Sequence, residues 1–352
     1  MPQKQFFSQD PFLSLPVEIR HAILCEMSDV GALDTAIKAD SSLQSVFLGS
    51  VSCILDRVLQ NSVSAKHFPE ILAIQASAHF DRKTWSRDKV STIIDSYFQR
   101  QQASPIQWTL PDALYLNDLN RHIQYFVDEF ATTTLSVHPA SSEPFTYTPL
   151  SPVERCRIAG AFYRFELYCN LFREYGHGYK TASEPFSADE QKDIFLARFS
   201  PWEIEQLGCI HDYLVEKITP GFVDMAEHDV EWGKLTVPYD IEYVLELQPY
   251  LSNTLSLGLA DIHRLVIATN YEERHQLLSG HETGIYNFLW DAMWIRRDNE
   301  CDRCVYQKGK SSTDDPDPGP YNAWYWAHKD ATDQDFAYTE EDKSLRRRGY
   351  VM

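Results

Sequence analysis

The chain has 352 residues, of which 43% are hydrophobic and 13% aromatic, so it can bury a core and is not intrinsically disordered. Its formal net charge of −19 repels nucleic acid and anionic membranes at long range, although a local basic patch can still bind phosphate. No run approaches the roughly 18 apolar residues that span a bilayer, and the polar first ten residues lack the apolar core of a signal peptide. We therefore expect a soluble, cytoplasmic protein that does not bind membranes.

Residues 11–48 show a helical periodicity of apolar positions, which predicts two or three short amphipathic helices. The pattern L-P-V-E-I at 15–19 resembles the start of an F-box, a small helical motif that docks a ubiquitin-ligase scaffold protein. In F-boxes the proline opens the first helix, where a missing N–H costs nothing. The resemblance implies an F-box-like motif over residues 1–50 that binds the scaffold through Leu15, Pro16 and Ile19. The alternative is a helix hairpin that packs on the rest of the fold.

Residues 51–130 read as further helices, and we expect residues 51–352 to form one large helical domain. A basic cluster surrounds Trp85 and consists of Arg82, Lys83, Arg87 and Lys89. Such interleaving can hold a phosphate backbone, but a solvated helix face is the favoured interpretation. Residues 131–151 are rich in Ser, Thr and Pro without periodicity, which predicts a loop or weak boundary.

Three helix starts are predicted by a capping serine with an acidic residue three positions later, at 151–154, 187–190 and 200–203. The first helix buries a series of apolar residues from Ile158 to Phe172, and its arginines are expected to lie off that side: Arg155, Arg157, Arg164 and Arg173. The third helix is expected to stop at residues 219–221, which read Thr-Pro-Gly.

The densest group of carboxylates follows that predicted stop. In a helix, Asp224, Glu227 and Glu231 fall at i, i+3 and i+7 and share one face. Because like charges repel, this face is either solvated or lies against a cation such as a metal, a basic partner, a guanidinium or an ammonium group. His228, between Glu227 and Asp229, is either a proton relay or a surface histidine.

The stretch 321–328 contains two tryptophans, two tyrosines and a histidine. Such large side chains favour a C-terminal clasp that packs on the core. The alternative is a binding platform for an aromatic or cationic group.

No strand-like alternation longer than four or five residues and no internal repeat are found, so the fold class is predicted to be mainly α. Phosphate-binding glycine loops, hydrolase elbows and zincin motifs are also missing from the sequence. Nucleotide-dependent, hydrolase and zinc-protease functions are therefore disfavoured.

Four segments together resemble a large family of filamentous-fungal proteins: PWEIEQL at 201–207, HDVEWG at 228–233, GPYNAWYWAH at 319–328 and RGYVM at 348–352. Within that neighbourhood the chain resembles the arginine-containing cyclodipeptide synthases of fungal secondary metabolism, which join arginine from arginyl-tRNA to a second amino acid from another aminoacyl-tRNA. That family is associated with an Asp-Asp-x-x-Glu motif, and the closest match is 223–227, with Val223 in place of the first aspartate. The valine marks either an inactive or a differently specific relative.

The resemblance implies an aminoacyl-tRNA-dependent acyltransferase that needs no metal or other cofactor, because the ester is already activated. Asp224, Glu227 and His228 would be catalytic, with Glu227 or His228 as the base that keeps the attacking amine neutral. Carboxylates suit an arginine pocket because they receive a guanidinium in bidentate fashion. The substrate-binding side chains would be Asp229, Glu231, Trp324, Trp326 and His328, and the tRNA would need the basic strips at 82–89, 296–297 and 346–348. This enzyme is the first hypothesis, and an F-box-type adaptor without catalytic activity is the second.

Overall fold

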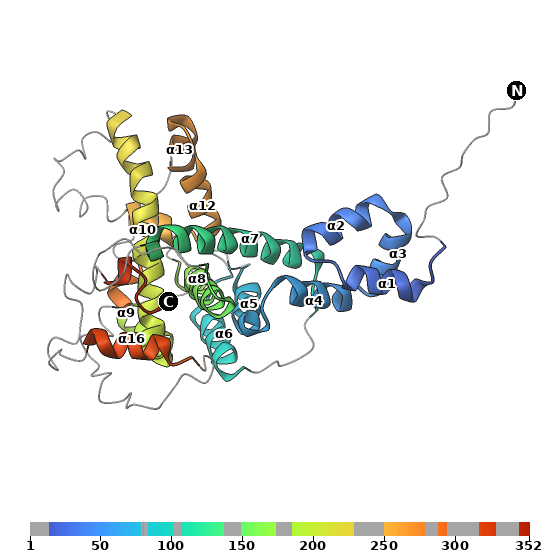
Figure 1. Cartoon of the computed structure of the whole chain (residues 1–352), viewed down its shortest axis with the longest axis horizontal. Coiled ribbons are helices and arrows are strands. Elements are labelled where there is room, and N and C mark those ends of the chain that lie inside the picture. Colours follow the sequence, from blue (N-terminus) through green and yellow to red (C-terminus); the bar gives the residue numbers. More distant parts are fainter. Residues whose placement is uncertain are drawn as a thin grey trace, which may run out of the picture. The chain divides into compact units, whose positions relative to one another are not determined.

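A computed structural model describes residues 14–78, 80, 84–100, 107–136, 149–173, 185–228, 250–278, 288–293, 317–328 and 345–352 (Figure 1). Within these ranges the regular elements are helices and no strand occurs, which confirms the mainly α prediction.

The α-helices with named bounds are α1 (Val17–Cys25), α2 (Val30–Ala39), α3 (Ser41–Gly49), α4 (Val51–Ser62), α5 (Phe68–Ser77), α6 (Arg87–Gln99), α7 (Leu110–Thr133), α8 (Pro152–Phe172), α9 (Ala188–Ile194), α10 (Pro201–His228), α12 (Leu259–Ile267), α13 (Tyr271–Leu278) and α16 (Gly319–His328). Short 3-10 helices are η1 (Ala65–His67), η2 (Thr134–Ser136) and η3 (Leu196–Arg198). Residues 250–256 are also helical.

The chain divides into two compact units, of which the first comprises residues 1–68 and 102–121. In this unit α1 packs on α3 and α4, and α2 packs on the same two helices. Asp29 and Asp40 cap the amino ends of α2 and α3, since each carboxylate accepts backbone N–H groups that have no helical partner. Besides α1 to α3, both α4 and the start of α7 belong to this unit.

The second unit comprises residues 69–101 and 122–352, and the described helices α8 and α10 pack against each other in it. The three predicted starts are confirmed: Ser151 and Ser187 form capping boxes with Glu154 and Glu190, and Ser200 donates to Glu203 at the start of α10. The apolar series of α8 is buried as expected.

The expectation that the arginines of α8 lie off its buried side was wrong for two of them. Arg157 is buried and its guanidinium donates to Asp317 at 2.7 Å, and the Arg164 side chain is only 13% exposed. Both can be buried because carboxylates from distant segments receive their charge.

The predicted stop of the third helix at residues 219–221 was also wrong, because α10 continues through Pro220 to His228. Pro220 cannot donate a hydrogen bond to the preceding turn. The turn after it is held by tertiary packing: Phe222 and Met225 are buried, and the Phe222 ring lies against Tyr250. Burial of these large side chains outweighs the local breaker signal.

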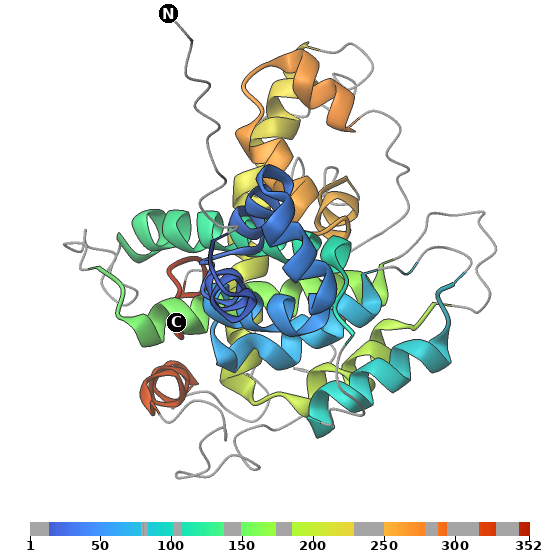
Figure 2. The ribbon, with the colours of Figure 1, turned by 90° about the vertical axis from the view of Figure 1, so that its right-hand side faces the viewer.

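The second half of α10 packs against α12 and α13. Figure 2 shows these two helices (orange) beside the end of α10 (yellow). In the described part of the chain, no single helix is long and apolar enough to cross a membrane; α3 and α4 reach that length only together, across a bend of 100°.

Candidate functional sites

The first candidate site is the exposed face at the start of α1. Pro16 is the N-cap residue, one position before the helical position that the sequence predicted, and its carbonyl accepts from the Ile19 N–H at 3.1 Å. Pro16 and Ile19 stand three residues apart, so they share one face of the helix. Both are exposed, Ile19 to 48%, whereas Leu15 is half-buried. Val17 is 51% exposed, so apolar side chains surround this helix start, and no element among the described residues of the first unit covers them.

The rest of α1 is fixed to its own unit. Leu24 is completely buried, and Arg20 donates to the Ser42 carbonyl of α3 at 3.3 Å. The helix is therefore anchored at its carboxyl half and presents its amino half to solvent. The exposed apolar side chains of the amino half are next to one another, and contiguous groups of this kind are found at interaction surfaces.

The second candidate site is the acidic end of α10. Asp224 pairs with Arg274 of α13, whose second guanidinium nitrogen donates to the Ala268 carbonyl at 3.0 Å. The two side chains of the pair are 29% and 23% exposed, respectively. A carboxylate at this position thus receives a guanidinium, which is the interaction that an arginine pocket needs, but here the guanidinium belongs to the chain itself.

The other predicted members of the acidic site are Glu227, His228, Asp229 and Glu231. Glu227 and His228 are the last residues of α10 before residue 229, and their side chains lie outside the described part of the structure. Asp229 and Glu231 also lie outside the described residues.

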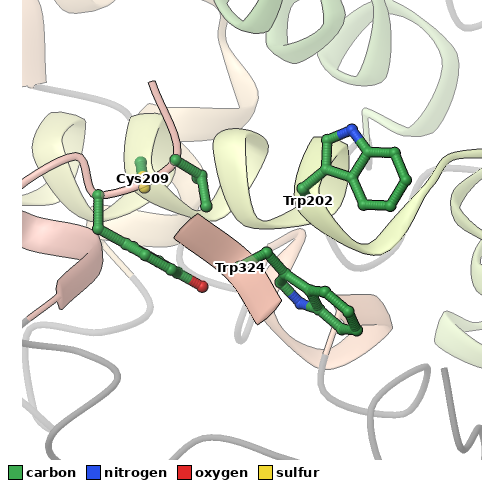
Figure 3. Packing of buried hydrophobic residues seen from close by; sticks show 5 residues of the cluster. Trp202, Cys209 and Trp324 are labelled. Carbon is green, nitrogen blue, oxygen red and sulfur yellow. The ribbon is translucent and has the colours of Figure 1, made fainter. Parts of the chain in front are cut away.

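The aromatic tail belongs to the opposite end of α10. Trp324 of α16 is 2% exposed and packs in a cluster with Trp202 and Cys209 of α10 (Figure 3). The two indole centroids are 6.4 Å apart. Trp326 is 46% exposed on the same helix, and the side chain of His328 is outside the described part.

The segment 345–352 is tied to the same half of α10. Arg346 is buried and makes a bidentate pair with Glu205, in which its Nε lies 2.6 Å from Oε2. Gln206 donates to the Val351 carbonyl at 3.1 Å. Burial and the neighbouring Glu205 carboxylate raise the pKa of Tyr350 well above its usual value, so its phenol stays protonated and donates to Glu205.

Gly208 makes room for this pairing. A methyl group on Gly208 would lie 2.9 Å from the guanidinium carbon of Arg346, too close for van der Waals contact. The glycine costs helix stability, and the close approach of Arg346 explains its presence in the middle of α10.

The tryptophan cluster and the acidic end are therefore separate sites. Cys209 and Asp224 are fifteen residues apart on one helix, which corresponds to about 22 Å at a rise of about 1.5 Å per residue. The structure does not bring Trp324 and Asp224 into one pocket.

Two arginines of the proposed basic strips are already paired within the chain. Arg346 is committed to Glu205, and Arg87 pairs with Glu190 and lies over the Phe186 ring. Trp85 is 3% exposed and donates to the Leu171 carbonyl, so it is a core residue. Residues 82–83 and 296–297 lie outside the described ranges.

A buried ionic group that sequence reasoning missed lies between α5, α8 and α10. The Arg164 guanidinium stands between the carboxylates of Glu70 and Glu203, at 4.0 and 3.7 Å. Tyr97 donates to Glu70 at 3.0 Å, and burial, followed by the charge of Glu70, raises the Tyr97 pKa well above its ordinary value. No local spacing signals this group, because its members are far apart in the sequence. Among the described residues, no cluster of three or more His, Cys, Asp or Glu side chains could hold a metal ion.

No protein-family model matches the chain, and neither a curated protein nor a solved structure matches it.

Proposed function

We propose that this protein is an F-box-type adaptor that docks a ubiquitin-ligase scaffold protein through the start of α1. The observation that carries the proposal is the exposed pair Pro16 and Ile19 on the first turn of a helix whose other end is anchored in its own compact unit. The L-P-V-E-I pattern supplies the chemical identity of the partner, because it is the part of the sequence that resembles an F-box.

Binding to the scaffold subunit tests the proposal. The full chain should retain the purified scaffold subunit in a pull-down, and Ile19→Asp should abolish that retention by placing a charge in an apolar interface. Ile267→Asp is the matched control, because Ile267 is 49% exposed on α12 and Ile19 is 48% exposed. Circular dichroism should show that both variants remain helical. Equal retention of the two variants, or no retention of the unaltered chain, contradicts the adaptor.

The arginine-containing cyclodipeptide synthase is the second candidate. The ion pair between Asp224 and Arg274 favours the synthase, because a carboxylate at this end of α10 binds a guanidinium there. Arg87 and Arg346 count against it, because both are paired with carboxylates of the chain itself, whereas tRNA binding needs arginines or lysines that contact phosphates.

Product formation tests the second candidate. Bacteria that express the chain should release an arginine-containing diketopiperazine, detectable by mass spectrometry of the medium. Glu227→Ala should abolish the product, whereas Glu272→Ala, which removes an exposed carboxylate of α13, should leave the yield unchanged. Absence of any such product, or its persistence in Glu227→Ala, rejects the synthase.

A further inference from the structure

Two histidines from different helices lie against each other in the second unit. The imidazole rings of His122 in α7 and His263 in α12 have centroids 4.6 Å apart, and their planes are inclined by 47°. Both side chains are half-buried, so solvent reaches the pair from outside the core. Imidazole is the commonest metal ligand among side chains, and two imidazoles this close together are the elements of a metal site.

The His263 ring is held in place by aromatic neighbours. The ring of Tyr125 meets it edge-on at a centroid distance of 4.5 Å, and the ring of Phe126 meets it edge-on at 5.8 Å. Phe126 is completely buried and stacks on Phe162 of α8 at 5.7 Å. Because α7 carries His122, Tyr125 and Phe126 at i, i+3 and i+4, one face of this helix sets the position of both imidazoles. Ligands positioned in this way lose little conformational entropy when an ion binds.

The separation of the two rings suits a single ion between them. A metal–nitrogen bond of about 2.0–2.1 Å places the centroid of a bound imidazole about 3.2 Å from the ion. Two such rings have centroids about 4.5 Å apart when their bonds to the ion meet at a right angle, and about 5.2 Å apart at the tetrahedral angle. The observed 4.6 Å matches the right angle. Square-planar and tetragonal ions have ligands at right angles, whereas Zn²⁺ prefers the tetrahedral angle.

Each ring can direct a nitrogen at the ion without leaving its place. The two nitrogens of an imidazole lie at different points of the ring, and a half-turn about the bond to the ring exchanges its two edges while the ring plane stays where it is. Ligation uses one nitrogen and leaves the other to make a hydrogen bond, as is usual for histidines that bind metals.

We propose that His122 and His263 form a binding site for a divalent transition-metal ion of tetragonal preference, Cu²⁺ or Ni²⁺, which links α7 to α12. One nitrogen of each imidazole binds the ion, and water fills the remaining positions. The net charge of −19 favours the approach of a cation. The site belongs to the second unit and is separate from the docking function proposed for α1 in the first.

Metal titration of the full chain, made without an affinity tag, tests the site. Calorimetry at about pH 7.5, where an ordinary imidazole is neutral, should show one site that binds Ni²⁺ more tightly than Zn²⁺. His122→Phe and His263→Phe each keep an aromatic ring in the cluster but remove its nitrogens. Each should weaken Ni²⁺ binding by about 100-fold, because binding by two linked ligands becomes binding by one. His275→Phe is the matched control, since His275 is an exposed histidine of the second unit whose ring lies beside Tyr271, and it should leave the affinity unchanged.

Thermal unfolding gives a second measurement on the same proteins. Because the ion binds the folded chain, saturating Ni²⁺ should raise the Tm of the unaltered chain and of His275→Phe by a few degrees, and should not raise that of the other two variants. The Tm values without metal show whether each variant folds.

Spectroscopy of the unaltered chain needs no variant. With one equivalent of Cu²⁺, electron paramagnetic resonance should show a tetragonal ion coupled to two imidazole nitrogens. The proposal is overturned if the ion couples to one nitrogen only, if the unaltered chain binds no Ni²⁺, if Zn²⁺ binds more tightly than Ni²⁺, or if His275→Phe weakens binding as much as His263→Phe. Because these assays contain no scaffold protein, their outcome is independent of the docking experiment.

Discussion

The two halves of α10 use the same kinds of residue in different ways. In the first half, Glu205 receives a buried arginine, and Trp202 lies under α16 and the segment 345–352. In the second half, Asp224 receives an arginine whose side chain is 23% exposed. The difference teaches that a carboxylate and a guanidinium in contact do not define a site by themselves. Burial decides how much the loss of one partner destabilises the fold.

The largest expected effect is the loss of Arg346. Arg346→Ala leaves the Glu205 carboxylate, which is only 13% exposed, without its cationic partner and with the Tyr350 hydroxyl as a neutral donor, which should lower the free energy of unfolding by about 3–5 kcal/mol. Arg347→Ala, at the exposed neighbouring position, should change it by less than about 0.5 kcal/mol. Denaturant unfolding measures both values, and equal effects would show that the pair is not structural.

Truncation of the two tail tryptophans should lower the free energy of unfolding according to how deeply each one is buried. Trp324→Ala removes a side chain that is 2% exposed, and we expect a loss of about 3–5 kcal/mol from the cavity and the lost burial. Trp326→Ala, two residues along the same helix, should cost less than about 1 kcal/mol because the indole is 46% exposed. If Trp326→Ala proves as costly, the tail contacts more of the fold than the described residues include.

Gly208→Ala tests the space that Arg346 needs. In the unaltered chain the new methyl group should displace the Arg346 guanidinium, which is held by Glu205, and lower the free energy of unfolding by about 1–3 kcal/mol. In an Arg346→Ala background the same change should stabilise α10 by up to about 1 kcal/mol, because alanine is the better helix former. A double-mutant cycle on the free energy of unfolding measures this reversal of sign. Additive effects of the two substitutions would show that Gly208 does not make room for Arg346.

At the other end of the helix, Arg274→Ala should cost about 1–2 kcal/mol, since the pair with Asp224 is partly solvated. Raising the salt concentration should reduce this cost, whereas it should leave the cost of Arg346→Ala nearly unchanged. Urea unfolding at low and high ionic strength provides the measurement, and a salt-independent cost for Arg274→Ala would remove the contrast between the two halves.

The smallest effect concerns acid stability. A backbone hydrogen bond from Gly319, followed by the Arg157 side chain, lowers the pKa of Asp317 at the start of α16. A folded pKa below the unfolded value contributes stability above the unfolded pKa of about 3.9, and this contribution is lost as pH falls through the folded pKa. Because the Asp317 side chain is 43% exposed, the contribution should stay below about 1 kcal/mol. Asp317→Asn should flatten the stability profile below about pH 4, and an unchanged acid limb would contradict this assignment.

The sequence predicted what local spacing encodes. The capping boxes at Ser151 and Ser187 join residues three positions apart, and the buried series of α8 follows from helical periodicity. The continuation of α10 through Pro220 was missed because it depends on packing with segments distant in the sequence.

The candidate sites show the same limit. The L-P-V-E-I pattern predicted the start of α1. That its side chains are exposed could be seen only in the structure. Nothing local distinguishes Arg346 from the exposed Arg347, because the partner of Arg346 lies 141 residues away. The sequence favoured a C-terminal clasp but did not distinguish the buried Trp324 from the exposed Trp326, since the two differ only in the side of α16 that they occupy.

The contact between Arg346 and Glu205 also has a consequence for synthesis of the chain. The ribosome adds about 5–20 residues per second, so the 141 residues between the partners take on the order of 10 s to make. During that interval the first half of α10 has left the ribosome, while the segment that will cover Trp202 and Cys209 has not been made. The nascent chain thus exposes an apolar strip beside a carboxylate that has not yet met Arg346, and such transiently exposed apolar surface favours aggregation.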